Sequence, residues 1–135
     1  MLSQEIEKTV LVVDDNEDTR NSIKVLLELI GLNVRTMEDG EEAIQEIKNH
    51  KYDLLIFDVS MPRIDGVELF QLVKNSEGQR NIPVLFTSGL PSWSEPEEQR
   101  REILNKAEAY IQKPFNTDVF LETIRRLLQK RNSIA

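Results

Sequence analysis

The stretch Val10-Leu11-Val12-Val13-Asp14-Asp15 decides the fold of this chain. Four aliphatic residues in a row end abruptly at two carboxylates, and a helical pattern follows them. A strand that is buried on both faces of a sheet has such a continuous Val/Ile/Leu sequence, because neither face meets water. The stretch therefore predicts a central parallel strand whose carboxyl end opens into an acidic loop.

The same strand–helix unit recurs along the chain. Further strands are expected at 32–37, 53–57, 82–86 and 108–112, and helices at 18–30, 39–48, 67–73, 97–105 and 117–130. Five such units in succession predict an α/β fold, a flavodoxin-like doubly wound sheet of five parallel strands in the order 2-1-3-4-5 with five helices. A length of 135 residues accommodates one domain, with its core at about 8–130, and no effector domain is visible.

Composition excludes several classes of function. Lys plus Arg is 17 and Asp plus Glu is 24, which leaves a net charge of −7 and disfavours direct binding to nucleic acid phosphates. No cysteine is present, so disulfides and cysteine zinc sites are excluded, and the single His50 excludes a histidine metal cluster. The longest apolar runs have four residues, whereas a membrane helix needs about 20. A cytoplasmic domain without membrane association is expected.

Polar residues stand where the predicted strands end: Asp14 and Asp15, then Asp58, Thr87 and Lys113. Ligands of open α/β sheets bind outside the carboxyl ends of the strands, so these side chains should converge. Two carboxylates ~4 Å apart repel each other by roughly 4 kcal/mol at an effective dielectric of about 20, and a divalent cation relieves that repulsion. Oxygen ligands without His or Cys favour Mg²⁺, Mn²⁺ or Ca²⁺, and a small site with room for water and phosphate suits Mg²⁺.

Each carboxylate taken singly is also what a turn or a helix cap requires, so the hypothesis rests on their joint position and on Lys113. A site for a metal alone would gain nothing from an ammonium, whereas a site that accepts a phosphoryl group needs cations around its oxygens. The Thr87 hydroxyl can donate to the same group. Asp58 is then the candidate nucleophile, because a carboxylate can form an aspartyl phosphate.

These residues lie in motifs with a known counterpart. The motifs are Val12-Val13-Asp14-Asp15, Asp58-Val59-Ser60-Met61-Pro62-Arg63-Ile64-Asp65-Gly66, Thr87-Ser88-Gly89 and Lys113-Pro114-Phe115. Together and in this order they resemble the receiver domain of two-component response regulators. The resemblance covers nearly the whole chain, about residues 8–130. A single motif of this set is weak evidence, whereas the four together are highly specific.

The resemblance implies a phosphorylation-driven switch. Asp58 would accept a phosphoryl group from a phosphohistidine of a sensor histidine kinase or a histidine phosphotransfer protein. Asp15 and Asp58 would bind Mg²⁺ directly, with the main-chain carbonyl of Ser60 as a third protein ligand and Asp14 assisting through water. Such a domain promotes only its own phosphorylation and dephosphorylation, so we do not expect an enzyme that acts on other substrates.

The resemblance also implies how the signal leaves the site. Thr87 would move toward the phosphoryl group, and Tyr110 matches the aromatic position that rotates inward with it. The Lys113–Pro114 bond is usually cis in the family. A phosphoryl group adds about −1.5 to −2 charge, and the face formed by the fourth helix, the fifth strand and the fifth helix would change its affinity for a downstream protein. The domain is expected to be a monomer or a weak dimer.

Residues 90–96 depart from the family pattern. This proline-bounded segment, Leu90-Pro91-Ser92-Trp93-Ser94-Glu95-Pro96, is several residues longer than the usual connection between the fourth strand and the fourth helix. Trp93 is interpreted either as a hydrophobic cover for that loop or as a contact for a partner. Glu95, Glu97, Glu98, Arg100 and Arg101 are expected to form a solvated, charged face.

Three other functions are weighed against the switch. A receiver-like domain that only docks to partners would not require the complete set of site residues. A haloacid-dehalogenase-like phosphatase also uses an Asp nucleophile with Mg²⁺, but it needs an acid/base Asp two residues later, where this chain has Ser60. Flavin binding is disfavoured because the acidic loop at residues 14–18 would repel a phosphate.

Overall fold

The computed structural model describes residues 7–133. The strands are β1 (Thr9–Val13), β2 (Asn33–Met37), β3 (Leu54–Asp58), β4 (Val84–Ser88) and β5 (Ala109–Gln112). The helices are α1 (Glu17–Leu29), α2 (Gly40–Asn49), α3 (Gly66–Lys74), α4 (Glu98–Lys106) and α5 (Thr117–Ser133), with a short 3₁₀ helix η1 (Ser92–Ser94) before α4. Within the described part of the chain, no helix is long and apolar enough to cross a bilayer.

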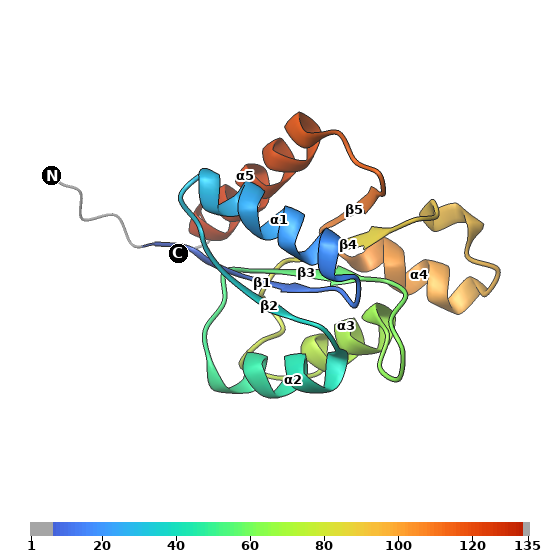
Figure 1. Ribbon diagram of the computed structural model, residues 1–135. Coiled ribbons are helices and arrows are strands. Elements are labelled where there is room, and N and C mark those ends of the chain that lie inside the picture. Colours follow the sequence, from blue (N-terminus) through green and yellow to red (C-terminus); the bar gives the residue numbers. More distant parts are fainter. Residues whose placement is uncertain (1–6, 134–135) are drawn as a thin grey trace, which may run out of the picture.

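The five strands form one parallel sheet in the order β2-β1-β3-β4-β5, which confirms the predicted fold. Helices α1 and α5 cover one face, and α2, α3 and α4 cover the other (Figure 1). Alternate residues of β1 pack into different halves of the core: Leu11 and Val13 face α2 and α3, whereas Val10 and Val12 face α1 and α5. Both faces of the strand are buried from solvent, which is why its sequence is continuously apolar.

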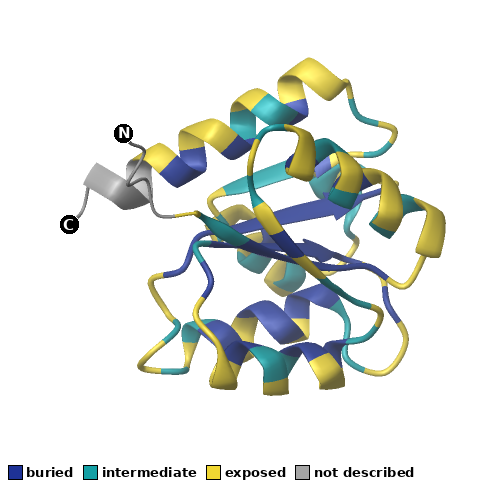
Figure 2. Cartoon of the chain, turned by 60° about the vertical axis from the view of Figure 1, so that its left-hand side comes forward, coloured by how far each residue is buried: buried dark blue, intermediate teal, exposed yellow. Residues whose placement is uncertain are grey.

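Burial follows the layers of the fold. The central strands are buried, and the outward faces of the helices are exposed (Figure 2). The fourth strand differs from the expectation, because it begins at Val84 instead of Ile82 and includes Thr87 and Ser88. Pro83 has no N–H to donate to a neighbouring strand, although its carbonyl accepts a hydrogen bond from Leu55 N (3.0 Å). Because β4 extends to Ser88, the sheet itself holds Thr87 beside Asp58.

Local signals set the ends of the first helix. The Asn16 side chain caps α1 by accepting a hydrogen bond from Thr19 N (2.9 Å). Gly31 follows the helix with a φ of 89°, a left-handed conformation that favours glycine. Asn16 thus orients α1 directly after the Asp14-Asp15 pair.

The structure decides between two interpretations of Trp93 and corrects one expectation for α4. Trp93 does not cover the loop, because it is 78% exposed, and its role as a contact for a partner stays a prediction. Arg100 does not belong to a solvated face, because it lies between two carboxylates, those of Asp65 and Glu95. The position of Arg100 depends on how α4 lies against the start of α3, which the order of residues along α4 does not reveal.

Candidate functional site

The carboxyl ends of β1 and β3 bring three carboxylates together. The two strands are neighbours in the sheet, with Val13 paired to Phe57, so Asp14 and Asp58 leave it side by side. Carboxylate oxygens of Asp14, Asp15 and Asp58 all lie within 4.8 Å of one another. Asp14 and Asp58 are buried, at 1% and 7% exposure, whereas Asp15 is exposed.

Lys113 completes the cluster from the end of β5. Its Nζ lies 2.9 Å from Asp14 Oδ2 and 3.6 Å from Asp58 Oδ2. Its main-chain N–H donates to Ser88 O (2.6 Å), which ties the residue to β4. The Lys113–Pro114 peptide bond is cis, as the resemblance implied. One ammonium therefore neutralises part of the charge of three carboxylates.

Backbone contacts orient the two buried carboxylates. Asp14 Oδ1 accepts a hydrogen bond from Asn16 N (2.9 Å), and Arg20 Nη1 donates to the Asp14 carbonyl (2.8 Å). Asp58 Oδ1 accepts from Ser60 N (3.3 Å). Arg20 could not be recognised from the sequence, because an arginine in the first turn of a helix has no local pattern that marks such a contact.

The electrostatics of Asp58 reflect its surroundings. Burial and the neighbouring Asp14 carboxylate raise the pKa of Asp58 from 3.8 to about 6, and Asp15 adds a smaller increase. The Lys113 ammonium and the Ser60 N–H counteract the rise. An Asp58 carboxylate that is ionised at neutral pH is therefore held in an unfavourable, net negative site. A hard divalent cation fits this all-oxygen donor set, because it supplies the missing positive charge.

Thr87 contributes a buried hydroxyl beside Asp58. It lies beside Asp58 in the sheet register, is 1% exposed, and its Oγ1 makes no hydrogen bond within the described structure. Buried hydroxyls are nearly always hydrogen-bonded, so an unpartnered one requires an explanation. An anionic group attached to Asp58 would offer the acceptor that this hydroxyl lacks.

Three further residues of the predicted motifs and switch lie around the carboxylate cluster. Tyr110 is half-buried and its hydroxyl donates to Leu90 O (2.5 Å), so it is linked to the loop before α4. Ser60 is exposed at the start of the loop after β3, and metal binding by its carbonyl stays a prediction. Gly66 packs against this loop so closely that a Cβ would lie 2.3 Å from Asp58 O.

Comparison with known proteins now decides the family. Residues 10–125 match the family model of the response regulator receiver domain. The chain belongs to this family. The receiver domain of a signal transduction histidine kinase from Syntrophus aciditrophicus has the same fold, with a TM-score of 0.82, 30% identity and 91% of each chain covered. A CheY-like receiver domain protein from Methanospirillum hungatei gives a TM-score of 0.85 at 26% identity, covering 96% of this receiver domain and 100% of that chain.

Curated relatives differ widely in length. The gliding motility regulatory protein of Myxococcus xanthus is 37% identical over 119 residues, which are 87% of this receiver domain but 15% of that protein. The polar-differentiation response regulator DivK of Brucella anthropi is 31% identical over 121 residues, which are 90% of this chain and 96% of the relative. Receiver domains thus occur both as parts of long proteins and nearly alone.

Proposed function

We propose that this receiver domain is a phosphoacceptor switch in a two-component phosphorelay and that Asp58 carries the phosphoryl group. The observation that carries the proposal is the arrangement around Asp58. Two further carboxylates, an ammonium and an unpartnered hydroxyl converge on one buried side chain. A surface that only docks to partners does not require this costly accumulation of like charge.

Asp15 and Asp58 are the residues that would hold Mg²⁺, with Asp14 assisting through water and the Ser60 carbonyl as a further ligand. When bound, Mg²⁺ supplies positive charge to the oxygens of the transferring phosphoryl group. Among the residues of the chain, Asp14 anchors the Lys113 ammonium at 2.9 Å. That contact holds the ammonium close to Asp58, where it stabilises the same oxygens.

The reaction is a phosphoryl transfer to the Asp58 carboxylate. One Asp58 oxygen forms a bond to phosphorus while the N–P bond of the donor phosphohistidine breaks, and the electron pair stays on the imidazole nitrogen, which takes up a proton. Thr87 donates its hydroxyl hydrogen to a phosphoryl oxygen. Dephosphorylation is the attack of water on the same phosphorus, which returns the carboxylate and releases phosphate.

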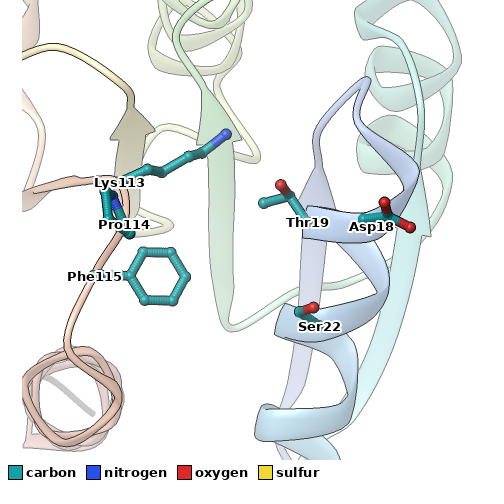
Figure 3. Close-up of a pocket in the computed structure, with 6 residues that line it drawn as sticks. All are labelled: Asp18, Thr19, Ser22, Lys113, Pro114 and Phe115. Carbon is teal, nitrogen blue, oxygen red and sulfur yellow. The ribbon is translucent and has the colours of Figure 1, made fainter.

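A groove beside Lys113 gives a partner access to the site. It has a volume of about 500 Å³ and lies between the start of α1 and the segment after β5. Asp18, Thr19 and Ser22 form one wall and Pro114 and Phe115 the other, with the Lys113 side chain reaching from one wall toward the opposite one (Figure 3). We infer that this domain works in the cytoplasm and that a sensor histidine kinase or a histidine phosphotransfer protein approaches along this groove.

The output of the switch is assigned to the face formed by α4, β5 and α5. Tyr110 in β5 bonds to the loop before α4, so a movement of Thr87 or Tyr110 changes this face and its affinity for a downstream protein. Direct binding to nucleic acid is not part of the proposal, because a net charge of −7 opposes it.

Intact mass spectrometry tests the proposal. Incubation with acetyl phosphate and Mg²⁺ transfers the phosphoryl group to Asp58 and releases acetate, so we expect one adduct. The adduct is absent in Asp58→Asn and in the presence of EDTA. A folded protein that stays unmodified with acetyl phosphate and with phosphoramidate supports the docking alternative instead, and turnover of a general phosphate ester supports the phosphatase.

A further inference from the structure

Arg100 joins two loops that flank the phosphoacceptor. Its Nη1 lies 3.1 Å from Asp65 Oδ2, and its Nε lies 3.3 Å from Glu95 Oε2. The three side chains are 26%, 22% and 18% exposed, so they are shielded more than ordinary surface ion pairs. Burial alone would lower the pKa of Arg100, but the Asp65 and Glu95 carboxylates raise it. The guanidinium is thus permanently charged and bound on both sides.

On one side, Asp65 is linked through Gly66 to the segment that carries Asp58. Asp65 Oδ1 caps α3 by accepting a hydrogen bond from Glu68 N (3.0 Å), and a capping box completes that helix start, which leaves Oδ2 for Arg100. The next residue, Gly66, donates from its N–H to Val59 O (3.1 Å) and packs against the Asp58 carbonyl. A shift of the Asp58 segment therefore moves the Asp65 carboxylate with it.

On the other side, Glu95 holds the loop that carries Trp93. Its Oε1 accepts a hydrogen bond from Glu97 N (3.3 Å), and its carbonyl accepts one from Arg101 Nη1 (2.5 Å). Its own N–H donates to Ser92 O (3.3 Å), which closes the turn around Trp93. The position of Glu95 therefore sets the position of the exposed indole.

The far end of the same loop leads back to the site. Leu90 N donates to Ser88 Oγ (3.1 Å), and Leu90 O accepts from the Tyr110 hydroxyl (2.5 Å). Ser88 directly follows Thr87, whose hydroxyl lacks a partner. A cavity of about 80 Å³ lies beneath the loop, bounded by residues that include Ser60, Glu95 and Arg100. The loop therefore has space into which it can move when Thr87 is drawn toward a phosphoryl group.

We propose that Arg100 is a positioning residue that couples the phosphoacceptor loop to the Trp93 loop, so that phosphorylation of Asp58 changes the environment of Trp93. The inference rests on the proposed function and adds a route for the signal that runs through Asp65 and Glu95. Arginine suits this task, because its planar guanidinium presents donors in a fixed fork to two carboxylates at once, whereas a lysine ammonium is a single point charge.

Trp93 provides the readout, because it is the single tryptophan of the chain. The experiment follows Trp93 fluorescence in the full chain during addition of acetyl phosphate and Mg²⁺, while intact mass gives the fraction phosphorylated. We expect a fluorescence change in the wild type that is proportional to the adduct. In Arg100→Gln the change in Trp93 fluorescence per phosphorylated molecule should fall about threefold. This is the size of effect expected when a residue that couples two sites is lost.

Three further variants separate coupling from simple stabilisation. Arg125→Gln is the matched control, because Arg125 is exposed on α5 and contacts neither Asp65 nor Glu95 in the described structure, and it keeps the full response. Asp65→Asn retains an oxygen that caps α3 and loses the charge, so it reproduces Arg100→Gln. Arg100→Lys has an intermediate response.

The outcomes distinguish this inference from the proposed function. Absence of an adduct in the wild type overturns both. An adduct without a fluorescence change in the wild type overturns only the coupling. An Arg100→Gln or Asp65→Asn protein that is phosphorylated and responds like the wild type also overturns the coupling, and so does an equal loss of response in Arg125→Gln.

Discussion

Replacing Asp58 by Asn should stabilise the metal-free protein at neutral pH. The folded state raises the pKa of Asp58 from 3.8 to about 6, and this difference is worth about 3 kcal/mol at ~1.36 kcal/mol for each pKa unit. Water and salt reach the site through the exposed Asp15 and screen its charges. We therefore expect about half of this energy, roughly 1.5 kcal/mol, as the gain in the free energy of unfolding of Asp58→Asn. The Asn side chain keeps an oxygen that can accept from Ser60 N.

The dependence on pH has a defined sign. The folded protein binds the Asp58 proton more tightly than the unfolded chain, so the free energy of unfolding falls as pH rises from about 4 to about 6. The penalty is complete above pH 6 and nearly absent at pH 4. The advantage of Asp58→Asn should therefore be a few tenths of a kcal/mol at pH ~4 and roughly 1.5 kcal/mol at pH ~7.5.

Urea denaturation in EDTA, followed by circular dichroism, measures both values. Glu122→Gln is the matched control, because it removes an exposed carboxylate of α5 and should leave the stability unchanged at both pH values. The reasoning about the site is refuted if Asp58→Asn is no more stable than the wild type at pH ~7.5, or if its gain is the same at pH ~4.

Three further predictions concern the site and the elements that hold it. Mg²⁺ at about 100 times its dissociation constant should raise the free energy of unfolding of the wild type by about 2.7 kcal/mol; an equal gain in Asp58→Asn, measured by urea denaturation, would contradict a role for this carboxylate in metal binding. Gly66→Ala should cost about 1–3 kcal/mol in the same assay, because its Cβ would lie 2.3 Å from a backbone oxygen of Asp58, and wild-type stability would show that the loop relaxes. Thr87→Val should leave the unphosphorylated protein at least as stable as the wild type, since the Thr87 hydroxyl has no partner in the described structure. The same variant should lose the Trp93 fluorescence response to phosphorylation, and a retained response would exclude Thr87 from the switch.

Much of the fold and of the candidate site could be predicted from local patterns. Val10–Val13 is continuously apolar because both faces of a central parallel strand are dry, and that property is visible in four consecutive residues. Asp14, Asp58 and Lys113 were expected to converge because parallel strands end at the same edge of a sheet, and the structure places the Lys113 ammonium within ion-pair distance of both carboxylates. Strand order and residue type were sufficient for this step.

The tertiary structure alone decided the features that depend on contacts between distant segments. Trp93 is exposed, which the sequence left open, and Arg100 is bound between Asp65 and Glu95, which the sequence did not indicate. The unpartnered hydroxyl of Thr87 likewise becomes visible only when all of its neighbours are placed. Apolar patterning reports on the average environment of a segment. An ion pair or a missing hydrogen bond depends instead on where side chains from distant segments lie, to within a few tenths of an ångström.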